Sequence, residues 1–318
     1  MKKYCLRITV FFFFLLLSVT TTLAQTKTIN GVVRQENNLK EGKIIIYLPE
    51  DMQAGDMISG TVVTEPNGKT EKEKRKNREL LLNYETNIPG VVFTPVKGDR
   101  QPINFIMPGK QSQLISRSND KVIQIINFPI PVSSNPLQSN TNITVPTHAL
   151  AGDPFRITGP FDGDASNTKC RLDGSAMEIL AESPRQIICT APQTTSGKHN
   201  IVVEEKGKTT ENKISIVNME LSAPKTKLLK GESTRIDVKV TGLDGIQSNI
   251  NITITNTSPS IINLSGGNTQ TIAITPSQVA TTGIYTQSFP VQSLTTGDFT
   301  VNVELKLPEP EKIPQAKM

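Results

Sequence analysis

Residues 236–240 read IDVKV and residues 250–254 read INITI, and these two stretches decide the fold class. In both, an apolar side chain alternates with a polar one. Successive side chains of a β-strand point to opposite faces, so a period of two gives each stretch one buried and one solvated face. The turn-forming residues Gly242 and Gly245 separate the two stretches. The pattern therefore predicts two half-buried strands joined through a turn.

Apolar rows of the same kind recur at short intervals along the chain. They lie at residues 43–48, 57–63, 91–93, 103–106, 122–128, 155–157, 187–188, 201–203, 214–216, 272–274 and 299–305. Several short strands with turns every ~8–12 residues are typical of sandwiches and barrels. Because the sequence has no long amphipathic helical pattern, it is predicted to be all-β, with several β-sandwich domains in tandem.

Two stretches rich in proline and small polar residues, 131–140 and 222–224, are predicted linkers. Without the predicted leader at 1–24, the 318-residue chain keeps 318 − 24 = 294 residues, which suits two or three domains of roughly 100 residues each. The predicted parts are an N-terminal β-sandwich domain at 25–137, a middle domain at 138–217, a C-terminal β-sandwich domain at 218–306 and a tail at 307–318. The tail holds three prolines and several charges, so we expect it to be disordered.

Residues 1–24 have the three-part pattern of a signal peptide, with basic residues first, an apolar run at 8–17, and the small residue Ala24 before Gln25. A bilayer span needs ~20 apolar residues, so this run is too short for an anchor. Cys5 precedes the run, which argues against lipid attachment. We predict a cleaved signal peptide and an extracytoplasmic protein, in the periplasm, at the cell surface or secreted, with no membrane insertion after cleavage.

Charge gives little indication of an electrostatic partner. The leader carries three basic and no acidic residues, so its removal lowers the formal net charge from +5 to +2. The positive and negative charges nearly balance, and the mature chain has no cluster of basic residues. We therefore predict no nucleic-acid partner. The segment 71–79 (EKEKRKNRE) mixes both signs, and Glu71 and Arg75 stand four residues apart as in a solvated helix. We interpret it as a charged loop or helical insertion; the alternative is a docking site for an acidic partner.

The middle domain carries a series of short motifs between residues 145 and 203. They are Gly152-Asp153, Ile157-Thr158-Gly159-Pro160-Phe161, Leu172-Asp173-Gly174, Ser183-Pro184-Arg185-Gln186-Ile187, Cys189-Thr190-Ala191-Pro192 and Gly197. In this layout the domain resembles the IPT/TIG family of immunoglobulin-like domains, over roughly a quarter of the chain. The flanking domains resemble generic bacterial immunoglobulin-like modules. The leader, which ends in Leu-Ala-Gln without a lipobox, resembles those of exported proteins of Bacteroidetes-type bacteria.

The resemblance implies tandem immunoglobulin-like β-sandwich domains that serve as a scaffold. Such domains occur in surface receptors and adhesins and as accessory modules of extracellular enzymes, where they space other parts or bind.

Cys170 and Cys189 are the two cysteines that remain after leader removal. In an oxidising compartment a disulfide between them is the predicted state, and it would add about 3 kcal/mol by closing a loop of ~20 residues. Their separation is short for the inter-sheet bridge of antibody-type domains, so we expect a link between neighbouring strands or loops. Two reduced buried thiols and a redox pair are the alternatives, although no CxxC spacing supports redox work.

Residues 162–167 (DGDASN) place oxygen ligands at alternate positions, as a calcium loop does. Asp162, Asp164 and Asp173 are the candidate ligands. Asn167 stands where such a loop needs glycine, and Asp173 reaches less far than the usual bidentate glutamate. We therefore favour a polar turn without metal and keep calcium as the alternative; no cofactor is predicted.

No catalytic set is predicted. His148 and His199 are the only histidines, and the chain has neither a GxSxG nor an HExxH motif. A carboxylate pair for glycoside hydrolysis needs no fixed spacing in sequence. Sugar clefts, however, use aromatic platforms, and after the leader the chain offers no Trp and only Tyr47, Tyr84 and Tyr285 among tyrosines.

The function predicted from these observations is that of a non-enzymatic structural or protein-interaction module of adhesion type in the cell envelope. Its partner is predicted to be another envelope or extracellular protein. One alternative is glycan binding within a polysaccharide-capture system, and a second is a hydrolase with a carboxylate pair.

Overall fold

A computed structural model describes residues 25–29, 32–81, 84–86, 92–93, 99–108, 113–118, 121–127, 142–225, 228–297 and 299–308. The predicted signal peptide, the predicted linker at 131–140 and the tail beyond residue 308 lie outside the described residues. The described strands form four sheets of nine, eight, three and three strands, so the predicted all-β fold with immunoglobulin-like sandwiches is confirmed. Among these residues no helix is both long and apolar enough to cross a bilayer.

The first unit, described between residues 25 and 127, is built around one antiparallel sheet. Its main strands are β1 (Gln25–Ile29), β2 (Val32–Leu39), β3 (Gly42–Pro49), β4 (Met57–Pro66), β6 (Val92–Phe93) and β7 (Arg100–Ile106). A small second sheet contains β5 (Tyr84–Thr86), β8 (Gln113–Ser118) and β9 (Lys121–Asn127). The core of this unit consists mainly of side chains from β3, β4 and β7, with Ile44, Ile46 and Ile58 fully buried.

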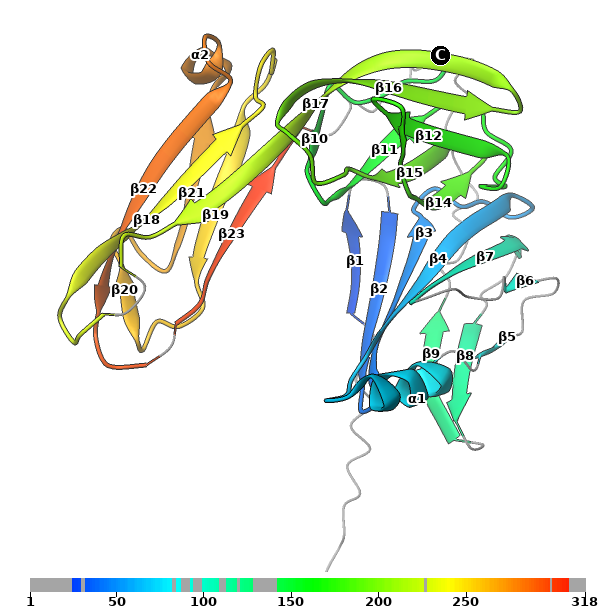
Figure 1. The fold of residues 1–318 in the computed structure, drawn as a ribbon, viewed down its shortest axis with the longest axis horizontal. Helices are drawn as coiled ribbons and strands as arrows, with labels where there is room; N and C mark the ends of the chain where they lie inside the picture. Colours follow the sequence, from blue (N-terminus) through cyan, green and yellow to red (C-terminus); the bar gives the residue numbers. More distant parts are fainter. Residues whose placement is uncertain are drawn as a thin grey trace, which may run out of the picture.

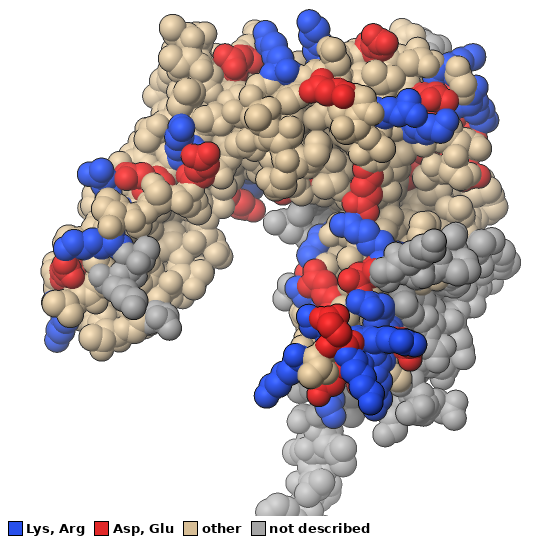
Figure 2. Space-filling view, viewed as in Figure 1, with Lys and Arg blue, Asp and Glu red and all other residues tan. Residues whose placement is uncertain are grey.

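The charged segment after β4 is the helix α1 (Glu71–Leu81), one of the two predicted forms. The Thr70 hydroxyl accepts the Glu73 N–H at 3.2 Å and the Glu73 carboxylate accepts the Thr70 N–H at 3.3 Å, which is a capping box at the N-terminus. Glu71 forms an ion pair with Lys74, and Arg75 forms one with Glu79. The predicted pairing of Glu71 with Arg75 is therefore replaced by these two pairs. Figure 2 shows the resulting mixture of positive and negative side chains over α1.

The middle unit, residues 142–217, is a two-layer sandwich. One layer holds β11 (Pro154–Thr158), β14 (Ile179–Ser183) and β15 (Gln186–Thr190). The other holds β12 (Thr168–Leu172), β13 (Ser175–Ala176), β16 (Gly197–Glu205) and β17 (Lys208–Ser222), with β10 (His148–Leu150) parallel to β17. Phe155, Ile187, Ile201 and Ile214 meet between the layers. The strands β12 and β14 are absent from the predicted rows. In β12 only Cys170 and Leu172 are apolar, and in β14 the buried residues include the polar Glu182 and Ser183.

The third unit, residues 218–308, packs two layers around the largest apolar cluster of the described chain. Strands β18 (Ser233–Thr241), β20 (Ile262–Leu264) and β22 (Ile284–Ser293) form one layer with the end of β17. Strands β19 (Ile250–Asn256), β21 (Thr269–Ile274) and β23 (Val301–Lys306) form the other, and a short helix, α2 (Pro276–Val279), precedes β22. The rows IDVKV and INITI thus belong to opposite layers, and their isoleucines and valines face each other in the core.

Each layer of the middle unit continues into a different neighbour. The layer of β14 joins the first unit, because Glu182 of β14 pairs with Ser59 of β4 in the nine-stranded sheet. The other layer joins the third unit through β17, which pairs with β16 at residues 208–216 and with β18 at residues 218–222. The predicted boundary at 217/218 falls inside this strand. Figures 1 and 2 show the result as an arch, with the first and third units as legs on either side of an open hollow.

Candidate functional site

The three predicted calcium ligands are not brought together. Asp162 and Asp164 lie in the turn before β12, where Asp164 accepts hydrogen bonds from the N–H (3.1 Å) and hydroxyl (2.8 Å) of Ser166. Asp173 lies at the opposite end of β12, where its carboxylate contacts His199 and the Asn200 N–H. The set Asp162, Asp164 and Asp173 is therefore not a ligand set in this structure.

Asp162 instead lies beside two glutamates that the sequence analysis did not single out. A carboxylate oxygen from each of Asp162, Glu182 and Glu205 lies within 4.8 Å of the other two. Glu182 comes from β14 in one layer of the middle unit, and Glu205 ends β16 in the other layer. Both are in the interior, with Glu182 0% and Glu205 8% exposed. We call Asp162, Glu182 and Glu205 the carboxylate cluster.

The hydrogen bonds of the carboxylate cluster leave one oxygen unsatisfied. Glu182 Oε1 accepts the Gly163 N–H at 3.1 Å, and Glu205 Oε2 accepts the Thr168 hydroxyl at 2.5 Å. Asp162 is partly exposed and accepts from the Asp164 N–H, the Asn167 amide and the Lys206 ammonium group, the last at 3.2 Å. Glu182 Oε2 is buried and has no hydrogen-bond partner among the described residues.

The electrostatics of the cluster follow from its burial. Burial raises the pKa of Glu182 to about 8. The nearby Thr168 hydroxyl and the Gly163 N–H oppose that rise, and the negative charges of Glu205 and Asp162 add to it. For Asp162, hydrogen bonds from Asp164, Asn167 and Lys206 outweigh the effect of burial, and its pKa is lowered. A proton or a cation is therefore needed to neutralise the interior of the cluster near neutral pH.

The cluster lies against the first unit. The Ser59 hydroxyl of β4 donates to the Gly163 carbonyl at 2.8 Å and accepts the Ala165 N–H at 3.0 Å. Gly163 has a φ of +85°, and a Cβ atom there would lie 2.0 Å from the Met57 carbonyl oxygen. Only glycine can allow so close an approach with that backbone conformation. The turn that carries Asp162 is thus part of the contact between the two units.

A buried ionic network holds the same two units together. The Arg185 guanidinium donates to the Asp51 carboxylate at 3.0 Å, to the Asp51 carbonyl at 2.7 Å, and to the Asp56 carboxylate. Asp51 also accepts the Ser183 hydroxyl at 2.9 Å and the Gln186 amide at 2.6 Å. The side chains of Arg185 and Asp51 are only 11% and 7% exposed. Strong, oriented bonds therefore fix the first unit to the middle one.

The structure corrects one prediction about the cysteines. Cys170 lies on β12 and Cys189 on β15, which belong to opposite layers, so the expectation that a bridge would join neighbouring strands is wrong. The two side chains project from facing layers into the same core and contact each other there. Both are free thiols in the structure, and a hydrogen bond to Cys170 together with burial raises the pKa of Cys189. The disulfide itself stays a prediction.

The two histidines lie apart and in different surroundings. His148 is buried where the middle and third units meet, and its Nε2 lies 3.1 Å from the Asp244 carbonyl oxygen. His199 Nδ1 lies 2.6 Å from the Asp173 carboxylate and its Nε2 lies 2.7 Å from the Thr195 carbonyl. The contact with Asp173 and the bond to Thr195 outweigh the effect of partial burial and raise the pKa of His199. With both ring nitrogens engaged, His199 is not placed as a general base.

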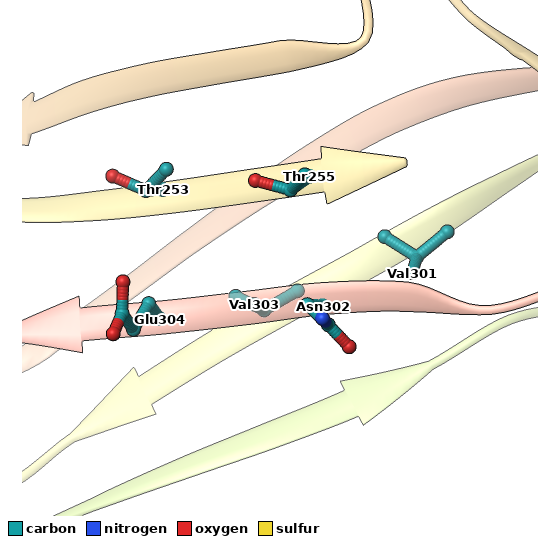
Figure 3. Close-up of a pocket in the computed structure, with 6 residues that line it drawn as sticks. All are labelled: Thr253, Thr255, Val301, Asn302, Val303 and Glu304. Atoms are coloured by element: carbon teal, nitrogen blue, oxygen red, sulfur yellow. The ribbon is translucent and has the colours of Figure 1, made fainter. Parts of the chain in front are cut away.

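A shallow pocket of about 460 Å³ lies on the three-stranded sheet of the third unit. Figure 3 shows Thr253 and Thr255 on β19, with the remaining lining residues on β23. Among the six lining residues Glu304 alone is ionisable. The pocket offers hydroxyl, amide and carboxylate groups for polar contacts.

These features define the described chain as a series of immunoglobulin-like β-sandwich units. Within it, residues 133–217 match the family model of the IPT/TIG domain, which confirms the resemblance of the middle domain. A comparison with curated protein sequences found no match.

Solved structures similar to the chain share only a coarse likeness. One is the SGBP-B protein of a Bacteroides ovatus mixed-linkage glucan utilization locus, in complex with a heptasaccharide, with 9% identity, 88% of each chain covered and a TM-score of 0.26. Another is the Escherichia coli adhesin FdeC, with 10% identity, 88% of this chain and 97% of that chain covered and a TM-score of 0.21. A third is E. coli α2-macroglobulin, with 9% identity, 90% and 22% covered, and a TM-score of 0.26.

Proposed function

We propose that the chain is a non-enzymatic, extracytoplasmic protein-interaction module whose three β-sandwich units hold binding surfaces at a fixed spacing. The observation that carries this proposal is that each layer of the middle unit is hydrogen-bonded into a different neighbouring unit. Joined in this way, the units form a continuous frame instead of domains on flexible linkers. A frame of this kind suits presentation of surfaces to a partner.

The edges of the third unit are the surfaces that suit a protein partner best. Strands β21 and β23 are the two outer strands of their three-stranded sheet. Outer strands present a row of backbone N–H and C=O groups that an extended segment of a partner can pair with. The same unit carries the exposed apolar side chains Leu229 (74% exposed) and Leu294 (43% exposed), which add apolar contact area.

The positions of two buried glutamates and two tyrosines support a non-enzymatic function over a hydrolase or a sugar-binding protein. Glu182 and Glu205 are close enough for a carboxylate pair, but both are buried, so a polymeric substrate has no access to them. The half-buried Tyr47 packs against an apolar cluster between the first two units, and Tyr285 packs against the core of the third. Neither is an open platform for a sugar, and glycan binding remains the alternative function.

Site-specific photocrosslinking tests the proposal. A photoreactive amino acid replaces the exposed Ala273 on the outer strand β21, and a matched variant carries it at the exposed Glu211 on β17 in the middle unit. In cells of the source organism, the Ala273 variant is expected to form one discrete adduct with another protein, and the Glu211 variant is not. Equal labelling from both positions, or none from either, would contradict a partner at this edge. Glycan-array binding by the same protein would favour the alternative.

A further inference from the structure

We propose that Asp162, Glu182 and Glu205 form a binding site for a hard divalent cation of the Ca²⁺ class, beyond the interaction function proposed above. Ca²⁺ is bound by oxygen ligands at about 2.3–2.6 Å, so two oxygens on one ion are at most about 5 Å apart. The three carboxylate oxygens of the cluster lie within 4.8 Å of one another and meet this condition.

Proximity of acidic groups is not enough for a site, but Glu182 supplies an independent indication. Its side chain is 0% exposed, and its Oε2 has no hydrogen-bond partner among the described residues. A buried carboxylate oxygen without a partner is unfavourable relative to one in water. One carboxylate oxygen of Glu182 lies within 4.8 Å of those of the other two residues, so a cation bound among them would neutralise this buried side chain.

The charges around the cluster also favour a cation. Among the described residues, no Lys or Arg forms an ion pair with Glu182 or Glu205. Lys206 pairs with Asp162 only, and its side chain is 62% exposed, so it can move into solvent when an ion binds. The Asp162 side chain is 19% exposed, which gives an ion a path from solvent. In the described part of the chain, no basic side chain therefore neutralises the buried carboxylates of Glu182 and Glu205.

The donor set decides the class of ion. All three side chains offer carboxylate oxygens, and the Thr168 hydroxyl lies 2.5 Å from Glu205 Oε2. Ligands that are exclusively oxygen suit hard cations and not zinc or copper, which prefer nitrogen and sulfur. A site made partly from a turn and partly from two strands is adaptable in geometry, which Ca²⁺ tolerates better than the strictly octahedral Mg²⁺.

A bound cation would act on the contact between the first two units. Asp162 is directly followed by Gly163, and Gly163 and Ala165 both bond to Ser59 of the first unit. An ion held by Asp162 on the turn and by Glu182 and Glu205 on the strands would fix this turn in its present position. Calcium is therefore expected to make this contact more resistant to unfolding.

The experiment uses the purified full chain, treated with EDTA and then titrated with CaCl₂ or MgCl₂ at neutral pH. Thermal unfolding and calorimetric titration are measured for the wild type and for Glu182→Gln, Glu205→Gln and Glu204→Gln. Glu204 is the matched control, because it precedes Glu205 on β16 but pairs with Lys169 at 3.1 Å outside the cluster. The glutamine variants keep the shape of the side chain, so they are expected to fold.

If the site binds Ca²⁺, CaCl₂ raises the Tm of the wild type and of Glu204→Gln, and more than MgCl₂ does. Glu182→Gln and Glu205→Gln then bind at least about tenfold more weakly, because affinity depends on the number of charged ligands. Two results would overturn the proposal: no stabilisation of the wild type by either ion, or equal stabilisation of all four proteins. In the first case a proton neutralises Glu182, and in the second the ion binds elsewhere. Neither result bears on the crosslinking test of the interaction function.

Discussion

The two contacts between units are built in different ways. The first and middle units share one backbone pairing, Glu182 with Ser59, and are otherwise joined by side chains far apart in sequence. The chief side-chain contacts are those of Arg185 with Asp51 and Asp56. The middle and third units are joined by the backbone itself, because the single strand β17 belongs to both sheets. There the added side-chain contacts are few, such as His148 with the Asp244 carbonyl.

This difference predicts where the molecule is sensitive to change. A contact made by buried charges depends on particular side chains, since removal of one leaves its partner buried without compensation. A contact made by a continuous strand depends on the chain, and a single side chain contributes little to it. Substitutions should therefore weaken the first contact much more than the second.

The largest effect is expected from Arg185→Met. The substitution keeps most of the side-chain volume but leaves the Asp51 and Asp56 carboxylates without their counter-charge, with Asp51 only 7% exposed. Loss of one partner of a buried ion pair costs about 3–5 kcal/mol. We expect the free energy of unfolding to fall by this amount, measured by urea unfolding with far-UV circular dichroism.

The matched control is Arg75→Met on α1, where the Arg75 side chain is 79% exposed and pairs with Glu79, which is 67% exposed. An exposed pair contributes little, so this variant should unfold like the wild type. If the two variants lose the same amount of stability, the Arg185 network does not hold the units together.

Sequence patterns predicted neither contact. The row at 214–216 indicated part of β17, but the predicted boundary at 217/218 falls within that continuous strand. The Arg185 network could not be predicted, because its partners lie more than a hundred residues apart and on different units.

The carboxylate cluster was found only in part, for the same reason. Asp162 stood out because oxygen-bearing residues alternate around it in sequence. Glu205 gave a signal that was not used: it continues the inward row of Ile201 and Val203, and a charge at an inward position requires a partner. Glu182 likewise follows the buried Leu180 at the spacing of one strand face. That these residues meet depends on how the two layers stack, which no local pattern contains.

The next largest effect is a pH dependence that arises from Glu182. Its pKa is about 8 in the folded protein, against 4.5 for an ordinary glutamate. The folded state therefore holds a proton that the unfolded state lacks, so this contribution to stability is complete below pH 4.5 and is lost as the pH rises through 8. In EDTA, Glu182→Gln should lack this decline and exceed the wild type above pH 8 by on the order of a few kcal/mol.

Urea unfolding at several pH values between 5 and 9 measures this dependence. If the free energy of unfolding of Glu182→Gln declined with pH as steeply as that of the wild type, a group other than Glu182 would bind the proton responsible.

A smaller loss is expected where glycine allows close approach at each contact. Gly163 and Gly242 both have positive φ, and a Cβ atom would lie 2.0 Å from the Met57 oxygen and 2.2 Å from the Ile216 oxygen, respectively. The controls are Gly55 and Gly245, which have similar φ values but no neighbour within 4 Å of the added atom. We expect Gly163→Ala and Gly242→Ala to lose about 1–3 kcal/mol more than their control variants, because the crowding adds to the backbone strain.

Thermal and urea unfolding of the four alanine variants test the role of these glycines. If Gly242→Ala costs no more than Gly245→Ala, the second contact does not depend on the close approach of the two backbones.

The smallest effect is expected at His148, and its direction is opposite to that of Glu182. Burial lowers the pKa of His148, and the nearby charge of Lys198 acts the same way, against the opposing influence of Asp244. The unfolded state then binds the proton more readily, so stability is complete above pH 6.5 and is lost as the pH falls through the folded pKa. Between pH 7 and 5 we expect the Tm of the wild type to fall by a few degrees relative to that of His148→Gln, whose amide does not titrate in this range. Because β17 keeps the middle and third units joined whatever the charge on His148, this loss should stay well below that of Arg185→Met. A larger loss in acid would mean that the second contact, like the first, depends on one buried side chain.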